Sequence, residues 1–287
     1  MLSKDDAIMN IGNIQNELNQ MVVIITGGNK GIGAGIAKAF CVYGAQVIIA
    51  ARDASVGQDF ADNLTKTTSG TCSFFQCDVS DDIQTKNMID KVVQRFGHID
   101  CLINNAGFLP RRRPIDDVSY NDLLNVMQVN LGGVFSMTKA ALPYLRSSHG
   151  SIINISSVLG HTGQEGSAIY AASKAAITAF SKSIACDEAR NGVRINVLSP
   201  GDIRSNLNNN EVDNTAHRVP VNSSNHIHWI NRQGAPEEIG TACLFLASSW
   251  ASFMTGSELF VDGGFFAGHG YKQQTFDWSN IMQTKNI

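Results

Sequence analysis

The sequence contains no apolar run that approaches the ~18 residues a helix needs to span a membrane. Its first twenty residues also lack the basic-then-apolar order of a secretory signal peptide. The acidic pair Asp5 and Asp6 argues against a mitochondrial transit peptide. We therefore expect a cytoplasmic protein with no membrane partner.

An excess of positive charge is absent too, because 22 Lys and Arg residues face 25 Asp and Glu residues and the net charge is −3. This balance gives no reason to expect nucleic acid as a partner. Cysteines are few and far apart, without a CxxC pair or a metal-like spacing: Cys41, Cys72, Cys77, Cys101, Cys186 and Cys243. Buried thiols and no metal site are therefore expected.

What the chain does contain is a glycine-rich stretch after a short apolar run. Met21 to Thr26 is expected to be a buried strand, and Gly27, Gly31 and Gly33 follow it. Helical spacing then begins at Ile36. A strand, a glycine turn and a helix present a helix N-terminus to a phosphate group. A plain structural turn is the simpler alternative, but the strand before it and the helix after it favour nucleotide binding.

Strand and helix patterns alternate along the rest of the chain. Further strands are expected at 46–51, 71–77, 101–104, 151–155, 194–198 and 258–261, and helices at 55–65, 81–96, 120–147, 169–190 and 236–248. Such alternation predicts a single-domain α/β fold of the Rossmann type. Its doubly wound parallel sheet has about seven strands, right-handed crossovers and helices on both faces. We place a leader at 1–20, the domain at 21–270 with a substrate lid at about 202–232, and a tail at 271–287.

Parallel strands end at one edge of the sheet, where ligands bind. Candidate residues after different strands should meet there: Gly27 to Gly33, Arg52, Asp78, Asn104 to Gly107, Ser157, and Pro200 with Gly201. Tyr170 and Lys174 share one face of the helix that follows Ser157. An ammonium beside a phenol lowers the pKa of the phenol from about 10, so Tyr170 is a candidate proton donor and acceptor. Alone, the YxxxK spacing occurs by chance on many helices.

Together these motifs resemble the short-chain dehydrogenase/reductase family across about residues 21–264. They are TGGNKGIG from Thr26, NNAG from Asn104, Asn130, Ser157, the Tyr170 to Lys174 segment, and Pro200-Gly201. Within that family the sequence most resembles the type 14 17β-hydroxysteroid dehydrogenases, notably in the segments LPYLRSSHGSIINISS and GHGYK.

The resemblance implies a role for each matched residue. Tyr170 is the general acid and base, Lys174 lowers its pKa and holds a ribose, Ser157 orients the substrate oxygen, and Asn130 holds a water in a proton relay. The implied cofactor contacts are Gly27, Asn29, Lys30, Gly31, Ile32, Gly33, Arg52, Asp78, Val79, Asn105, Ala106, Gly107, Tyr170, Lys174, Pro200, Gly201, Ile203 and Ser205. The cofactor supplies the hydride chemistry.

The cofactor preference depends on the end of the second strand, where an acid would hold the ribose of NAD and repel a 2′-phosphate. Ala51 stands there, Arg52 follows, and Lys30 lies in the glycine turn. A missing acid and two cations favour NADP(H). NAD(H) is the alternative if Asp53 takes the place of the acid.

The substrate is expected to be a partly apolar small molecule, with a steroid as one possibility. The pocket candidates are Phe108, Ser157, Leu159, His161, Gln164, Tyr170, Arg204 and Leu207. The leading prediction is an NADP(H)-dependent oxidoreductase that interconverts a carbonyl and a secondary alcohol. The alternatives are an NAD-dependent 17β-hydroxysteroid dehydrogenase and a dinucleotide sensor without turnover. Family members commonly form tetramers through their two long helices, so the resemblance implies a homotetramer.

Overall fold

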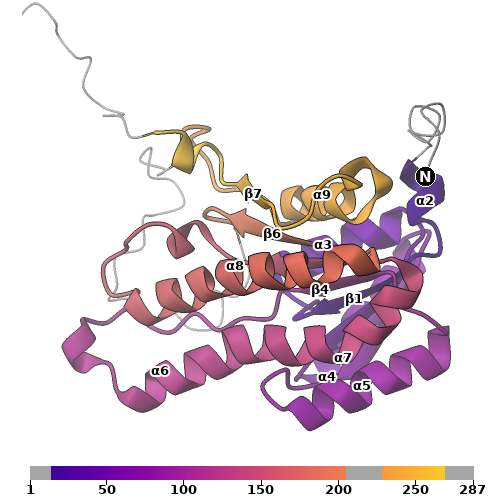
Figure 1. Cartoon of the computed structure of the whole chain (residues 1–287), viewed down its shortest axis with the longest axis horizontal. Coiled ribbons are helices and arrows are strands. Elements are labelled where there is room, and N and C mark those ends of the chain that lie inside the picture. The colour runs from indigo at the N-terminus through magenta and orange to yellow at the C-terminus, as the bar shows by residue number, and fades with distance from the viewer. Residues whose placement is uncertain (1–13, 205–227, 269–287) are drawn as a thin grey trace, which may run out of the picture.

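A computed structural model describes residues 14–204 and 228–268. Within these ranges, seven strands form one parallel sheet in the order β3-β2-β1-β4-β5-β6-β7 (Figure 1). The strands are β1 (Val22–Thr26), β2 (Gln46–Ala51), β3 (Thr71–Gln76), β4 (Cys101–Asn104), β5 (Ser151–Ile155), β6 (Arg194–Pro200) and β7 (Glu258–Val261). The predicted doubly wound parallel sheet is confirmed.

Helices cover both faces of this sheet. One face carries α3 (Gly31–Val42), α4 (Ala54–Thr67) and α9 (Pro236–Ala247), and the other carries α5 (Asp82–Phe96), α7 (Gly133–Ser148) and α8 (Ala168–Glu188). Alternate residues of β1 serve the two faces, with Val23 and Ile25 in one core cluster and Val22 and Ile24 in the other. Burial on both faces explains why this strand reads as one continuous apolar run.

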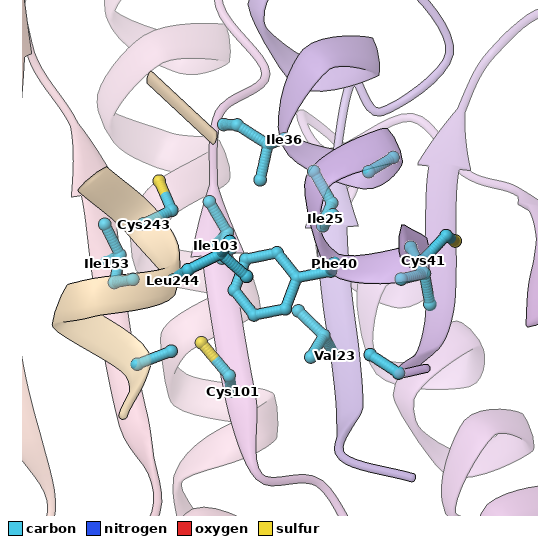
Figure 2. Close-up of a cluster of buried hydrophobic side chains, with 14 of the residues drawn as sticks. Val23, Ile25, Ile36, Phe40, Cys41, Cys101, Ile103, Ile153, Cys243 and Leu244 are labelled. Carbon is cyan, nitrogen blue, oxygen red and sulfur yellow. The ribbon is translucent and has the colours of Figure 1, made fainter. Parts of the chain in front are cut away.

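The core beneath the glycine turn is centred on Phe40 of α3. Its ring lies among Val23 of β1, Ile103 of β4 and Leu244 of α9 (Figure 2). Helices α3 and α9 approach closely at Gly35, where a Cβ atom would lie 2.4 Å from atoms of Pro236. This packing fixes the helix whose first turn faces the predicted phosphate site.

One crossover has the opposite hand to the others. The connection from β1 to β2 moves toward one edge of the sheet and the connection from β4 to β5 moves toward the other edge. Their helices, α3 and α7, lie on opposite faces, so the two crossovers have the same handedness. The step from β6 to β7 goes the same way as β4 to β5, yet its helix α9 lies on the face of α3 (Figure 1). The expectation of uniformly right-handed crossovers is therefore wrong for this unit. Right-handed crossovers are the rule in about 98% of parallel units, and this unit is one of the exceptions.

The predicted long helix at 120–147 is interrupted. It consists of α6 (Tyr120–Met127), a π-helical turn at Gln128–Gly132, and α7. A π turn admits one extra residue and is frequent at functional sites. Here it carries Asn130, which is fully buried.

Part of the expected leader packs on the domain. Helix α2 (Ile14–Leu18) places Leu18 in the core, and the Glu17 carboxylate accepts hydrogen bonds from the backbone N–H and hydroxyl of Ser249. The tail expected at 271–287, and residues 205–227 of the expected lid, lie outside the described residues.

Five of the six cysteines are buried, and Cys186 is exposed. Burial raises the pKa of the Cys77 thiol to about 11 and that of Cys101 to about 12, so both are uncharged at neutral pH. Across residues 14–204 and 228–268, no group of three His, Cys, Asp or Glu side chains is placed to bind a metal ion. We find no helix in the described ranges with the length and hydropathy of a membrane span.

Candidate active site

The glycine turn has a backbone that other residues would strain or obstruct. Gly27 and Gly31 adopt left-handed φ angles of 62° and 54°. A Cβ atom at Gly33 would lie 2.2 Å from the carbonyl oxygen of Gly27. Helix α3 then begins without a side-chain cap and without an acidic residue in its first turn. Its first N–H groups and the positive end of its dipole are suited to a phosphate.

A second loop is fastened to this turn. The Thr26 hydroxyl accepts hydrogen bonds from the backbone N–H groups of Asn105 (3.0 Å) and Ala106 (2.9 Å). The Asn105 amide donates back to the carbonyl oxygens of Thr26 (2.9 Å) and Gly27 (3.2 Å). The sequence prediction missed this function of Thr26, although a hydroxyl at the end of an apolar strand was a signal for it. The two loops that were expected to contact the cofactor thus form one unit.

Lys174 lies in the interior, with only 4 % of its surface exposed. Its ammonium donates to the carbonyl oxygen of Ile155 at 2.9 Å and lies 5.7 Å from the centre of the Tyr170 ring. Burial lowers the pKa of Lys174 to about 8, because an ammonium loses its hydration there. The side chain remains mostly protonated at pH 7.

Tyr170 departs from the expectation drawn from the sequence. Burial raises the pKa of its phenol, and a hydrogen bond with the Ser157 hydroxyl partly offsets that rise. A lowered phenol pKa was expected from Lys174, and that expectation is wrong for this structure. The reason is that desolvation penalises the phenolate more than the nearby groups stabilise it.

Asn130 joins the π turn to two other parts of the site. Its Oδ1 accepts from the N–H of Phe108 at 2.7 Å, and its Nδ2 donates to the Phe108 carbonyl at 3.1 Å. The same Nδ2 donates to the hydroxyl of Ser173 at 2.9 Å, which in turn donates to the carbonyl of Tyr170 at 2.7 Å. Asn130 therefore fixes the loop after β4 relative to the helix that carries Tyr170 and Lys174.

Gly107 marks a small space between two of these polar groups. A Cβ atom at this position would lie 3.5 Å from Asn130 Oδ1 and 3.5 Å from Lys174 Nζ. Glycine leaves this volume empty of protein atoms, so both polar atoms face it. Lys174 has three N–H donors, and one of them is used on Ile155.

The two cationic residues predicted to lie near the cofactor ribose, Arg52 and Lys30, are exposed. The side chains of Arg52 and Lys30 have no hydrogen bond or ion pair with the described residues. The Asp53 carboxylate caps α4, because its Oδ1 accepts a hydrogen bond from the N–H of Val56 at 3.1 Å. The turn adjoins this strand end, since Gly27 N–H donates to the Ala50 carbonyl at 2.7 Å.

The remaining predicted cofactor residues lie around the same edge. The Asp78 carboxylate accepts from the backbone N–H and the hydroxyl of Ser80, and Val79 is buried beside Gly133. Asn29 is buried and Ile32 packs against the core. A cavity of about 290 Å³ opens at the ends of β6 and β7, where Gly201 and Ile203 contribute to its wall. Ser205 lies outside the described residues.

The predicted pocket residues are less uniform in their positions. Phe108 and Arg204 are exposed, Leu159 is half-buried, and the Gln164 side chain accepts from the Ser167 hydroxyl at 3.1 Å. His161 is turned toward β7, because its Nε2 lies 2.7 Å from Oε1 of Glu258. Leu207 lies outside the described residues.

A parallel α/β sheet with a glycine turn, a bare helix N-terminus and a Ser, Tyr, Lys and Asn set defines a dinucleotide-dependent class of enzyme. A family profile described as "Enoyl-(Acyl carrier protein) reductase" matches residues 27–266. The chain belongs to the short-chain dehydrogenase/reductase family, and it is a short-chain dehydrogenase/reductase enzyme. Enzymes of this family use NAD(H) or NADP(H) and act on small molecules.

The chain is similar to named relatives over most of its length. L-fucose dehydrogenase of Bos taurus is 39% identical over 252 residues, which is 88% of this chain and 91% of that protein. The L-fucose dehydrogenase of Rattus norvegicus is 40% identical, with 88% and 91% covered. The 3-oxoacyl-[acyl-carrier-protein] reductase FabG of Chlamydia muridarum is 36% identical over 246 residues, which is 84% of this chain and 95% of that protein.

Proposed function

We propose that the chain is an NADP(H)-dependent oxidoreductase that interconverts a secondary alcohol and a carbonyl on a small, sugar-like molecule. The observation that carries this proposal is the convergence of Ser157, Tyr170 and Lys174 beside the glycine turn, where Asn130 fixes the neighbouring loop. The glycine turn suits a dinucleotide, because its glycines leave no side chain in the way of a pyrophosphate and α3 begins without a side-chain cap.

Each residue has a distinct task in the proposed reaction. A nicotinamide dinucleotide, when bound, would supply the hydride in reduction and accept it in oxidation. Tyr170 gives a proton to the carbonyl oxygen in reduction and removes the hydroxyl proton in oxidation. The Ser157 hydroxyl donates a hydrogen bond to the reacting oxygen and orients it. Lys174 and Asn130 would hold a water in the space beside Gly107, and this water would pass the proton from Tyr170 to solvent in oxidation and from solvent to Tyr170 in reduction.

Two of the relatives described above favour a sugar, because they are named L-fucose dehydrogenases. The anomeric carbon of an aldose carries one hydroxyl and one hydrogen, so removal of a hydride and a proton oxidises it as it oxidises a secondary alcohol. A 3-oxoacyl thioester is the second candidate, since FabG relatives are similar over a comparable length. A 17β-hydroxysteroid is the third candidate substrate, and it rests on the resemblance to the type 14 17β-hydroxysteroid dehydrogenases described above.

The test is a spectrophotometric assay of the purified full chain at the absorbance of the reduced nicotinamide. L-fucose with NADP⁺ or NAD⁺, a 3-oxoacyl thioester with NADPH or NADH, and a 17β-hydroxysteroid with either oxidised cofactor are compared. The proposal expects turnover of L-fucose with NADP⁺. Turnover restricted to the thioester or the steroid would reassign the substrate class, and no turnover of any of them would overturn the function.

The preference for NADP(H) is supported by the two uncommitted cations and by the use of Asp53 as a helix cap. One oxygen of the Asp53 carboxylate caps α4, and this structural use of the side chain supports NADP(H) over the alternative in which Asp53 takes the place of the missing acid. Arg52 and Lys30 would then be the residues that hold the 2′-phosphate of the cofactor. Guanidinium and ammonium groups both pair well with phosphate oxygens.

Replacing Arg52 by Asp is expected to shift the ratio of kcat/KM for NADPH over NADH toward NADH by about 10- to 100-fold. A charge-assisted hydrogen bond of about 1.5–3 kcal/mol is lost and a repulsive charge is gained. The matched control is Arg190→Asp, because Arg190 is exposed and distant in the chain from the glycine turn. An unchanged ratio in Arg52→Asp would contradict the assignment.

The homotetramer is a further part of the proposal. Members of this family are often tetramers. Helices α6 and α7 expose Tyr120 (73 %), Leu124 (47 %) and Phe135 (49 %), and the Phe135 ring lies 6.3 Å from that of Phe180 on α8. An apolar surface of this kind is typical of an interface.

Light scattering is expected to give the mass of a tetramer for the wild-type chain. Phe135→Glu is expected to give smaller species, because it buries a charge in the proposed interface. A monomeric wild-type chain, or a variant that remains tetrameric, would contradict this arrangement.

A further inference from the structure

We propose that Glu258 and His161 are positioning residues for the reaction described above. Their hydrogen bond anchors the turn that begins at Ser157, and so holds the Ser157 hydroxyl against Tyr170. The inference rests on the proposed function for its kinetic consequence, but its structural part can be measured without a substrate.

Glu258 is a buried carboxylate at the start of an otherwise apolar strand. Only 7 % of its side chain is exposed. Its Oε1 accepts hydrogen bonds from the Ser199 hydroxyl at 2.5 Å and is 2.7 Å from His161 Nε2. A carboxylate offers acceptors only, and two close donors compensate for its loss of hydration. Glu258 therefore joins β6, β7 and the loop after β5 at one oxygen atom.

His161 closes the short 3₁₀ turn that follows the catalytic serine. The turn is held by hydrogen bonds from Gly160 N–H to the Ser157 carbonyl at 2.9 Å and from His161 N–H to the Val158 carbonyl at 3.0 Å. The His161 ring also makes edge contacts with Phe260 at 5.3 Å and with Phe266 at 5.9 Å. These contacts fix the end of the turn on β7 and on the segment after it.

The start of the same turn carries the reacting group. Ser157 caps it by accepting from the N–H of Leu159 at 3.2 Å, and its hydroxyl is hydrogen-bonded to Tyr170. A turn anchored at one end only is free to rotate about that end. Release of His161 from Glu258 therefore leaves the Ser157 hydroxyl free to reorient relative to Tyr170 without removing either residue, and a small misplacement of a positioned group lowers kcat strongly.

Glu258 is also connected to α8, the helix that carries Tyr170. The Ser156 hydroxyl donates to the carbonyl of Lys174 at 2.8 Å, and the Thr178 hydroxyl lies 3.2 Å from that of Ser156 and 3.5 Å from Glu258 Oε1. Polar groups from the Ser157 loop, α8 and β7 thus form one buried network. Buried networks of this kind rigidify the elements that they join.

The experiment compares His161→Leu, His161→Gln and Glu258→Gln in the full chain. His161→Leu removes the donor and is expected to lower kcat about 10-fold, with the KM for the cofactor within about 2-fold of wild type. His161→Gln places an amide nitrogen near the position of Nε2 and is expected to recover most of the activity. Adding Glu258→Gln to His161→Leu is expected to cause little further loss, because the pair is already broken.

Amide hydrogen exchange measures the structural part without a substrate. His161→Leu is expected to speed exchange at the N–H groups of residues 159–161, and His161→Gln is expected to restore their protection. The control is Glu188→Gln on α8, outside the site. The Glu188 carboxylate is also 7 % exposed, and it forms an ion pair with Arg146 at 2.6 Å. That variant is expected to lose stability while kcat and the exchange of this turn stay unchanged.

Wild-type kcat together with unchanged exchange in His161→Leu would overturn the proposal. So would a His161→Gln variant as impaired as His161→Leu, because the hydrogen-bond donor would then be irrelevant. If the wild-type chain turns over none of the tested substrates, the proposed function fails, and the exchange data still decide whether the pair anchors the turn.

Discussion

Tyr170→Phe is expected to lower kcat by about 1,000-fold while leaving the affinity for NADPH within about 2-fold of wild type. In the proposed reaction the phenol exchanges the proton of the reacting oxygen, and phenylalanine retains its ring but not its hydroxyl. Ser157 would then lose its hydrogen-bond partner, but the glycine turn that is expected to bind the dinucleotide is untouched. Steady-state rates and a fluorescence titration with NADPH separate the two effects.

Tyr144→Phe is the matched control for this variant. Tyr144 is partly buried against the core on α7, so the substitution removes a phenol from a comparable environment outside the site. Its kcat is expected to equal that of wild type. A Tyr170→Phe enzyme with more than about a tenth of wild-type activity would contradict the role of Tyr170 as general acid and base.

The raised pKa of Tyr170 also gives the direction of the pH dependence. A phenol with a pKa above its ordinary value of 10 keeps its proton at neutral pH, which is the form that donates to a carbonyl. We therefore expect kcat for reduction to be favoured near neutral pH and kcat for alcohol oxidation to rise toward alkaline pH. An oxidation rate that falls from pH 7 to pH 9 would contradict this.

Lys174→Met is expected to lower kcat by about 100-fold and to change the pH dependence of stability. The methionine fills a similar volume without a charge, so the phenolate and the proton relay lose their ammonium. The control is Lys182→Met, which lies about two turns further along α8 and is exposed. Its kcat is expected to be unchanged.

The stability effect follows from the pKa of about 8 that burial gives Lys174. The folded state releases this proton as pH rises through 8, whereas the unfolded chain holds it until about 10.4. The unfolded state therefore binds more protons in this window, and stability rises with pH. Relative to Lys174→Met, the wild-type free energy of unfolding is expected to increase by about 2 kcal/mol between pH 7 and 9.5.

Denaturant unfolding of both proteins across that pH range measures the difference directly. A difference that stays constant from pH 7 to 9.5 would show that Lys174 has an ordinary pKa, and a decrease would reverse the sign of the burial effect. Full activity of Lys174→Met would contradict its part in the proton relay. The two readouts are independent, because one follows folding and the other follows turnover.

The positions of the strands and of the site residues were predictable because the signals are local. Successive residues of β1 are buried on opposite faces of the sheet, so every position of this strand needs an apolar residue. The sequence shows this as the continuous apolar run that begins at Met21. Parallel strands bring their carboxyl ends together whatever the length of the connections. The strand pattern alone therefore assigns Gly27, Ser157 and Pro200 to one edge of the sheet.

Other features depend on partners that are distant in the chain. The sequence does not say whether the Asp53 side chain has a partner at the start of α4, and only the tertiary structure shows its hydrogen bond with Val56. Glu258 and His161 are separated by 97 residues, so no spacing rule joins them. The opposite hand of the β6 to β7 crossover likewise depends on the packing of α9 beside α3.

The sequence by itself determined the class of fold, the glycine turn and the candidates for proton transfer, because hydrophobic period, turn chemistry and helical spacing act over a few residues. Only the tertiary structure decided the electrostatic state of those residues. Lys174 is buried and Tyr170 has a raised pKa because elements from the whole chain exclude water from them. Desolvation is a property of the complete packed environment, and neighbouring residues in the sequence do not fix it.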